Sequence, residues 1–348
     1  MRNLYIVFTK KRCYSILLIL AIIYFIGSCT NDDPNNPDQS NDVDSLNLQD
    51  DSDSFDLHST DSAFYNADGK IISAVCYGPF RNGQGPGSTL SKSQIKEDLL
   101  IMEKHWDAFR LYITDRNAEH ILKGIAENGI DIKVMLGVWI SGNAPKDNAT
   151  QVENAITLAN TYPDIVQAIS CGNEIFGLSG SDIFVSDKSE IIGYLNDMKE
   201  RTEVPVTIDD IYFVWMDDYY SDVVAALDFI TIHLYGQWSN VALENTVTYI
   251  DEVIHNLWEK YPDKEIVIGE TGWTTSKNPG QFGPVADEAS QKQFYEACQA
   301  WSKLNKVTVF YFEAFNERWK GDTAAEAETN WGFYYADRTP KLVFQTGD

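Results

Sequence analysis

The sequence has 348 residues, of which 44% are hydrophobic and 13% aromatic, and it carries a formal net charge of −25. A chain of this length can bury a large core, and single α/β barrels reach this size, so the length does not require two domains. The negative charge argues against nucleic acid as a partner, because phosphate binding needs clustered Lys and Arg. A neutral ligand fits this composition better.

The N-terminal residues have the pattern of a targeting signal. A basic stretch at residues 10–12 precedes an apolar run at residues 16–26, which is short for a membrane-spanning helix and typical of a signal-peptide core. Small residues then lead to Cys29, which resembles a bacterial lipobox in which cleavage leaves this Cys as the lipidated first residue. We predict a lipoprotein signal peptide over residues 1–28. An uncleaved membrane anchor and an ordinary signal peptide are the alternatives.

The next segment is polar and acidic. Residues 31–69 contain eleven Asp and no Lys or Arg, and such a segment cannot bury enough apolar surface to offset its ordering entropy. We predict a disordered tether over residues 29–69, followed by one catalytic domain over residues 70–348. The acidic residues directly after Cys29 resemble the export signal of surface lipoproteins in some Gram-negative bacteria. The expected location is the cell envelope, with the protein lipid-anchored to the outer membrane and exposed at the surface.

Cofactor and disulfide signals are weak in the predicted domain. Three cysteines remain there, Cys76, Cys171 and Cys298, so complete pairing is impossible, and buried free thiols are favoured over a single disulfide. The five His show no HExxH motif or paired ligand spacing, and we therefore expect no metal. No phosphate-binding glycine motif follows a strand, so we expect no nucleotide cofactor either.

From residue 70 the chain alternates short apolar segments with amphipathic ones, which is typical of a parallel sheet crossed by helices. The predicted strands are residues 71–78, 106–113, 131–139, 165–173, 204–210, 228–235, 265–270 and 307–313. The predicted helices are residues 91–104, 117–128, 148–161, 188–201, 217–226, 244–260 and 286–304. This α/β pattern favours a (β/α)8 TIM barrel, with a doubly wound sheet as the alternative.

Two of the predicted strands end in a carboxylate. Residues 266–268 are continuously apolar, as in a strand buried on both faces, and the run stops at Glu270. Residues 165–174 repeat this design and end in Asn173 and Glu174. A carboxylate where burial ends is costly unless it is paired, hydrogen-bonded or used. In a barrel, both would lie at the C-terminal strand ends, where active sites form.

Other polar and aromatic residues follow the same strand ends. They are Tyr77, Arg110, Tyr112, Trp139, Tyr235, Trp273 and Glu313. Aromatic rings stack on sugar faces, and two carboxylates supply an acid/base and a nucleophile for cleavage of a glycosidic bond. Together these residues predict a sugar site. Candidate stacking platforms, some of which we expect to be core, are Trp139, Phe176, Trp215, Trp238, Trp273, Phe315, Trp319 and Trp331.

The domain resembles glycoside hydrolase family 17, the β-1,3-glucanase family within a clan of retaining (β/α)8 barrels. The similarity covers nearly all of residues 70–345. It rests on five segments in order: FRLYITDRNAEHILKGIAENGIDIKVMLGVW (109–139), ISCGNE (169–174), IGETGW (268–273), FEAFNERWK (312–320) and NWGFYYADRTPK (330–341). The chain differs from plant relatives near Trp319, so subsite preferences do not follow from the resemblance.

The resemblance implies roles for individual residues. Glu174 would be the general acid/base and Glu270 the nucleophile, with Asn173 hydrogen-bonding the 2-hydroxyl of the sugar under attack. Residues implied at the nucleophile, the acid/base or the bound glucan are Arg110, Tyr235, Glu313, Glu317 and Lys320.

The activity that the resemblance implies is cleavage of β-1,3-glucan, such as laminarin, by an endo-acting enzyme through double displacement. A retaining mechanism of this kind needs the two carboxyl groups about 5–5.5 Å apart. No cofactor is required. The alternatives are a β-1,3-glucanosyltransferase that uses the same glycosyl-enzyme and, from another class, a surface glycan-binding protein that has lost catalysis.

Overall fold

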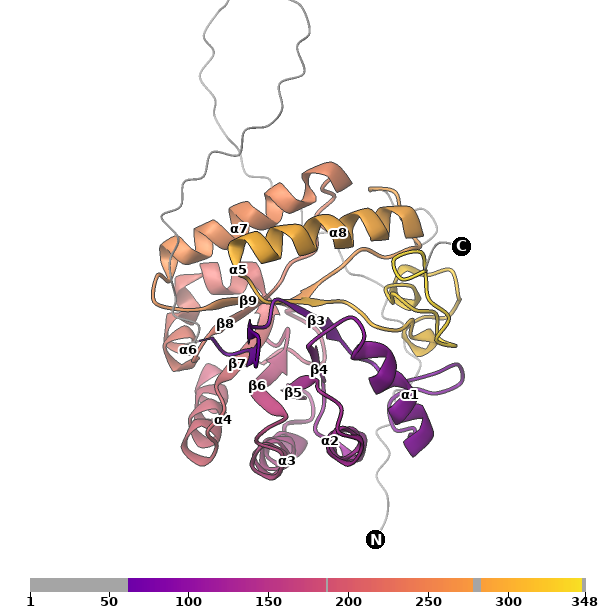
Figure 1. Ribbon diagram of the computed structural model, residues 1–348. Coiled ribbons are helices and arrows are strands. Elements are labelled where there is room, and N and C mark those ends of the chain that lie inside the picture. The colour runs from indigo at the N-terminus through magenta and orange to yellow at the C-terminus, as the bar shows by residue number, and fades with distance from the viewer. Residues whose placement is uncertain (1–61, 186, 278–282, 346–348) are drawn as a thin grey trace, which may run out of the picture. The chain divides into compact units, whose positions relative to one another are not determined.

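The computed structural model describes residues 62–185, 187–277 and 283–345. The predicted signal peptide, Cys29 and most of the predicted tether lie outside these ranges. Eight parallel strands close into a barrel, and helices surround it (Figure 1). The predicted (β/α)8 fold is therefore confirmed. None of the helices in these ranges has the length and apolar character that crossing a bilayer requires.

The barrel strands follow one another in chain order. They are β3 (Ser73–Cys76), β4 (Ala108–Arg110), β5 (Lys133–Val138), β6 (Val166–Asn173), β7 (Val206–Ile211), β8 (Ile230–His233), β9 (Ile266–Thr271) and β10 (Val309–Tyr311). Parallel pairing of β10 with β3 closes the barrel. All eight predicted strands are present, and most are shorter than predicted because the hydrogen-bonded ladder ends before the apolar pattern does.

The seven predicted helices are also present in the part of the chain that the structure describes. They are α1 (Lys92–Met102), α2 (Arg116–Asn128), α3 (Asn148–Thr161), α4 (Lys188–Arg201), α6 (Ser221–Ala226), α7 (Thr246–Lys260) and α8 (Glu288–Asn305). One short helix, α5 (Tyr212–Met216), was not predicted. Side-chain caps define several helix starts: Asp115, Asp187 and Asp287 accept backbone N–H groups at the first turns of α2, α4 and α8.

A hairpin closes the end of the barrel at which the strands begin. It consists of β1 (Tyr65–Asn66) and β2 (Gly69–Lys70), which pair antiparallel. Phe64, directly before it, is fully buried and packs edge-on against Phe229 and Phe310, with ring centroids 5.8 and 5.1 Å away. An aromatic pair of this kind adds about 0.5–1.5 kcal/mol beyond its buried area. The Phe64 ring therefore fills the barrel interior at this end.

The hairpin is also tied to the start of β9. Glu265 accepts hydrogen bonds from the Ser62 hydroxyl (2.8 Å) and the Ala63 backbone N–H (2.7 Å), and it pairs with Lys70 at 2.6 Å. The predicted tether over residues 29–69 is therefore wrong for residues 62–69, which belong to the barrel. The acidic composition of that segment concealed its buried apolar residues Ala63 and Phe64, which dock its last residues onto the barrel.

The barrel interior changes character along its axis. Its apolar part includes Ala74, Ala108, Met135, Ala168, Val267 and Phe310. Toward the C-terminal strand ends this lining gives way to charged or titratable side chains that are almost completely buried, namely Arg110, Asp209, His233 and Glu270. The three cysteines of the domain are free and buried, as predicted.

Candidate active site

An irregularity in β9 directs Glu270 into the barrel. The strands β8 and β9 pair in register as far as Ile268, and His233 then pairs with Glu270, so Gly269 is an extra residue. Regular alternation would place Gly269 and Glu270 on opposite faces, and a bulge is the usual way to re-aim such a side chain. Gly is required at 269 because a Cβ there would lie 2.2 Å from Oδ1 of Asp209.

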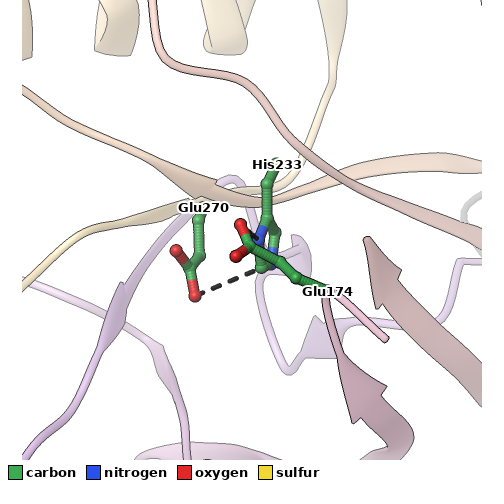
Figure 2. Close-up of side chains that lie close together, drawn as sticks. All are labelled: Glu174, His233 and Glu270. Atoms are coloured by element: carbon green, nitrogen blue, oxygen red, sulfur yellow. Dashed lines mark hydrogen bonds and ion pairs between the residues drawn. The ribbon is translucent and has the colours of Figure 1, made fainter. Parts of the chain in front are cut away.

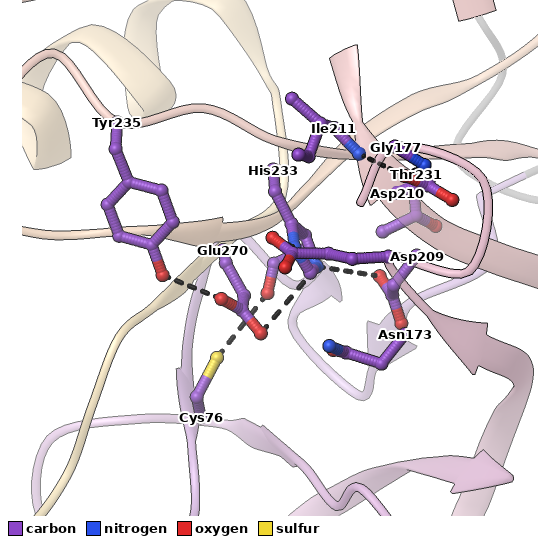
Figure 3. Close-up of polar contacts among 12 residues, drawn as sticks. Cys76, Asn173, Gly177, Asp209, Asp210, Ile211, Thr231, His233, Tyr235 and Glu270 are labelled. Atoms are coloured by element: carbon purple, nitrogen blue, oxygen red, sulfur yellow. Dashed lines mark hydrogen bonds and ion pairs between the residues drawn. The ribbon is translucent and has the colours of Figure 1, made fainter. Parts of the chain in front are cut away.

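The carboxylate of Glu270 is held by three donors. Arg110 Nη1 (2.6 Å) and the Tyr112 hydroxyl (2.9 Å) donate to Oε1. The Tyr235 hydroxyl donates to Oε2 at 2.6 Å (Figure 3). Burial raises the pKa of Glu270, but the positive charges of His233 and Arg110 and the tyrosine hydroxyls oppose it and lower the pKa to about 2. Glu270 is therefore an ionised carboxylate aimed into a closed site, which suits a nucleophile.

The guanidinium of Arg110 links several parts of the site. It forms an ion pair with Asp209 of β7, with Nε 2.8 Å from Oδ2, and Nη2 donates to Asn173 Oδ1 at 2.8 Å. The two carboxylates that flank it raise the pKa of Arg110 despite its burial. Asn173 thus has its oxygen occupied, and its amide nitrogen is directed toward Glu270 (Figure 3). An amide nitrogen in that position can donate to a sugar hydroxyl.

The second carboxylate, Glu174, ends β6 in an unusual backbone conformation. Its φ is +53°, which is uncommon for a residue other than Gly and is found most often at functional sites. Its backbone N–H donates to the Asp209 carbonyl at 2.8 Å. The next turn is held by Asp210, which accepts from the N–H groups of Phe176 (2.8 Å) and Gly177 (3.0 Å). The Glu174 side chain, 21% exposed, is the more accessible of the two.

His233 lies between the two carboxylates (Figure 2). Its Nδ1 is 2.8 Å from Glu174 Oε1, and its Nε2 is 3.6 Å from Glu270 Oε1 and 3.3 Å from Arg110 Nη1. Burial lowers the pKa of His233, but both carboxylates raise it and prevail. Sequence reasoning did not place His233, Asp209 or Asp210 in the site. For His233 a signal was present, because it is two residues from Tyr235 and therefore shares its face of the strand.

The spacing of these groups defines the available chemistry. One oxygen of Glu174, one oxygen of Glu270 and a ring nitrogen of His233 all lie within 4.8 Å of one another. The three residue types could in principle hold a metal ion. However, Oε1 of Glu270 already accepts from Arg110 and Tyr112, and the Arg110 charge opposes a second cation there. The arrangement instead suits a carboxylate nucleophile paired with a carboxyl acid/base.

A second charged cluster follows β10. Lys320 Nζ lies 2.7 Å from Glu313 Oε2 and 2.8 Å from Glu317 Oε2, and it sits over the Phe312 ring at 4.3 Å. Both glutamates are almost fully buried. Burial, together with the Glu317 charge, raises the pKa of Glu313 although Lys320 opposes this. The indole of Trp319 donates to Glu317 Oε1 at 2.9 Å, which fixes an exposed ring beside the cluster.

Two predicted substrate contacts are wrong. Tyr77 follows Cys76, which faces the barrel interior, so alternation turns the Tyr outward, and its buried hydroxyl donates to Asp98 of α1 at 2.9 Å. Trp273 lies beyond the bulge and is 1% exposed. Its ring packs on Phe294 of α8 and its nitrogen donates to the Val285 carbonyl. Neither ring can stack on a sugar.

The remaining candidate platforms divide into core and rim. Phe176, Trp215, Phe315 and Trp331 are almost completely buried and therefore belong to the core. Trp238 and Trp319 are 41% and 43% exposed, and Trp139 is half-buried. These three follow β8, β10 and β5, at the same end of the barrel as the carboxylates.

Comparison with known proteins gives the site a context. A family model described as the BtgE/BtgC glycoside hydrolase domain matches residues 74–332. A curated relative, the putative glucan endo-1,3-beta-glucosidase btgC of Aspergillus niger, is 28% identical over 282 residues. That alignment covers 72% of this chain but only 40% of the relative, so the chain spans about two fifths of that protein's length.

Solved structures share the fold. An endo-laminarinase from Formosa Hel1_33_131 superposes with a TM-score of 0.70 at 24% identity, covering 78% of this chain and 85% of that one. A glycoside hydrolase family 17 beta-1,3-glucanosyltransferase from Rhizomucor miehei gives 0.66 at 20% identity, covering 83% and 98%. At these identities the likeness establishes the barrel architecture alone.

Proposed function

The chain belongs to the BtgE/BtgC glycoside hydrolase family, and on that premise we propose that it is a retaining glycosidase that cleaves β-1,3-glucosidic bonds in laminarin-type glucans. The observation that carries the proposal is the approach of Glu174 and Glu270, whose nearest oxygens lie within 4.8 Å. Retaining enzymes place their carboxyl groups about 5–5.5 Å apart, whereas inverting enzymes need about 6.5–9.5 Å to admit a water molecule.

In the first half-reaction, Glu270 attacks the anomeric carbon and the bond to the leaving oxygen breaks. Glu174 delivers its proton to that oxygen, and a glycosyl ester forms on Glu270. With its pKa lowered to about 2, Glu270 is ionised near neutral pH, so the nucleophile needs no separate activation. Tyr235 and Arg110 hold its two oxygens in place until the bond forms.

In the second half-reaction, Glu174 takes a proton from water, whose oxygen attacks the anomeric carbon and releases Glu270. Asn173 would bind the 2-hydroxyl of the same sugar, where a hydrogen bond strengthens in the transition state. The product keeps the β configuration because the carbon is inverted twice.

The glucan assignment draws on the relatives and on the rim of the barrel. The Aspergillus niger relative is called a glucan endo-1,3-beta-glucosidase, and the Formosa structure is that of an endo-laminarinase. Half-buried or exposed indoles at Trp139, Trp238 and Trp319 offer surfaces on which successive glucose rings can stack. Endo action, with the glucan lying across these platforms, is part of the proposal.

A transferase is the second candidate. The glycosyl ester on Glu270 can be released by a sugar hydroxyl as well as by water, and one structural neighbour is a β-1,3-glucanosyltransferase. The acceptor hydroxyl gives its proton to Glu174, as water does in hydrolysis. The two activities differ only in which acceptor reaches the ester first.

The test is a time course on linear β-1,3-gluco-oligosaccharides that resolves product length and anomeric configuration. Shorter products in the β configuration support hydrolysis, and products longer than the substrate support transfer. Glu174→Gln and Glu270→Gln should abolish both, while Glu259→Gln on the exposed face of α7 serves as the control. Inactivity of the wild-type protein on every β-1,3-glucan would reject the substrate assignment, and α-configured products would reject the retaining mechanism.

We also infer that the catalytic domain is anchored to the outer membrane through lipid on Cys29, on the cell surface. The support is the sequence pattern of residues 1–33. Incorporation of a labelled fatty acid in a Gram-negative host, abolished in Cys29→Ser, would support the anchor. Digestion of the domain by protease added to intact cells tests its surface exposure.

A further inference from the structure

We propose that His233 is a positioning residue that determines which oxygen of Glu174 carries the catalytic proton. The proposal rests on the retaining mechanism given above. His233 is 1% exposed and reaches from the end of β8 to both carboxylates, with Nδ1 toward Glu174 and Nε2 toward Glu270 (Figure 2). Its Nε2 also lies near Arg110 Nη1. In the retaining mechanism given above, His233 takes no part in proton transfer.

The surroundings of the ring define its tautomer. Arg110 Nη1 lies 3.3 Å from Nε2, and a guanidinium nitrogen can only donate. A neutral His233 therefore keeps Nε2 as the acceptor and carries its proton on Nδ1. An imidazolium carries protons on both nitrogens. In either protonation state Nδ1–H donates to Glu174 Oε1, 2.8 Å away.

This hydrogen bond makes the two oxygens of Glu174 unequal. A protonated carboxyl group bears a single O–H, and Oε1 already accepts from Nδ1, so the proton resides on Oε2. In the first half-reaction this Oε2 proton passes to the glycosidic oxygen as that oxygen leaves carbon. In the second, a water proton returns to Oε2. His233 itself exchanges no proton with the substrate; its ring nitrogens face Glu174, Arg110, Glu270 and Asp209.

The charge around this pair changes during turnover. The charged or titratable groups that face Glu174 and His233 include Arg110, Asp209, Asp210, Tyr235, Glu270 and Glu328. When Glu270 becomes an ester it loses its negative charge, which removes the largest influence that raises the pKa of His233. The Nδ1–H donor survives this change, because the neutral tautomer also keeps it.

The test compares two substrates in three variants. His233→Asn retains a nitrogen donor near the position of Nδ1, whereas His233→Gln places its amide near Nε2 and His233→Ala has none. Each is assayed for kcat/KM on laminaritetraose, whose leaving group needs a proton, and on 2,4-dinitrophenyl β-laminaribioside, whose leaving group does not. This parameter covers steps up to the glycosyl ester. The ratio of the two values is independent of how much of a preparation is folded.

We expect Ala and Gln to lower the ratio of laminaritetraose to aryl-glycoside kcat/KM about 100-fold, the lower range for general acid catalysis, and Asn to keep it within about tenfold of wild type. A purely structural role would lower kcat/KM on both substrates alike and would not be rescued by Asn.

Two results would overturn the proposal: an unchanged ratio in His233→Ala, or the same loss in Asn as in Ala. His255→Asn, which changes an exposed imidazole on α7, is the matched control and should behave as wild type. A wild-type protein that cleaves neither substrate would instead reject the proposed function, so the two failures can be told apart.

Discussion

The two ends of the barrel are built on opposite principles. At the end where the strands begin, Phe64 and the β1–β2 hairpin close the interior by packing, and the buried carboxylate of Glu265 has three donors. At the other end, charged and titratable side chains fill the interior, and Glu270 and His233 are among them. On the proposed function, the first end serves stability and the second serves chemistry.

The difference shows where the chain holds costly conformations. The end at which the strands begin (the lower end) contains ordinary hairpin pairing and aromatic contacts. The end at which the strands finish (the upper end) contains the Gly269 bulge, the positive φ of Glu174 and a buried Arg110 between two carboxylates. Such features persist only when the surrounding structure enforces them, and they concentrate at functional sites. Substitutions should therefore separate activity from stability according to the end they touch.

The largest effect on activity is expected from Glu270→Gln. An amide of the same shape cannot form the glycosyl ester, so kcat should fall at least about 1,000-fold, as for other nucleophile substitutions. Arg110 keeps its ion pair with Asp209, and the melting temperature should change by only a few degrees. Laminarin hydrolysis and thermal unfolding measured on one preparation check both statements. A collapse of the fold would show that the upper end also carries the stability.

Phe64→Ala is the converse experiment at the lower end. Truncation of a fully buried Phe costs about 3–5 kcal/mol, which should lower the denaturant midpoint clearly, while kcat per folded molecule stays at the wild-type value. Phe213→Ala, which removes a half-exposed ring on α5, is the control and should cost little. If Phe64→Ala lowered kcat as strongly as it lowered stability, the two ends would be coupled rather than separate.

Gly269→Ala sharpens the comparison, because it changes a single methyl group at the upper end. The new Cβ would lie 2.2 Å from Oδ1 of Asp209. Either the bulge or Asp209, which forms the ion pair with Arg110, must therefore shift. A displacement of about 1 Å in a catalytic group costs about 100-fold in rate. Gly193→Ala in α4, where a Cβ meets nothing within 4 Å, should instead stabilise by about 0.5–1 kcal/mol. Equal kinetics in the two variants would contradict the role of the bulge.

The sequence predicted the repeating architecture well, since each buried parallel strand and amphipathic helix leaves its own period. It also identified the two carboxylates at strand ends, and their approach in space agrees with that prediction. It misassigned Tyr77 and Trp273 because a position at a strand end does not say which face a side chain takes. Simple alternation along the strand would have predicted that Tyr77 faces outward. The Gly269 bulge, and the change of face that it gives Trp273, leave no pattern in the local sequence.

Other features depended on distant contacts. His233 carries no motif, and its place between two carboxylates arises from three strands that are far apart in the chain. Phe64 lies in a segment whose composition indicates disorder, and only Phe229 and Phe310 give it a partner. Periodicity therefore predicts the barrel, while the filling of both of its ends is decided by tertiary packing.

The smallest expected effect concerns a buried lysine near the upper end. Lys341 is fully buried, and its Nζ donates to Thr275 Oγ1 (2.9 Å) and the Asn330 carbonyl (3.0 Å). Burial lowers the pKa of Lys341 to about 7, from its ordinary value of 10.5. Between these two pH values the unfolded chain binds a proton that the folded chain does not, so this residue makes stability rise with pH across that window.

Lys341→Met should remove this contribution. Relative to wild type, the variant should become less stable as pH increases from about 7 to 10, by at most about 1.4 kcal/mol per pH unit, the limit for one proton. Urea unfolding at several pH values measures the slope, with Lys303→Met on the exposed face of α8 as the control. Parallel curves for wild type and Lys341→Met would mean that the lysine stays charged in the fold. The upper end would then tolerate a buried positive charge on Lys341.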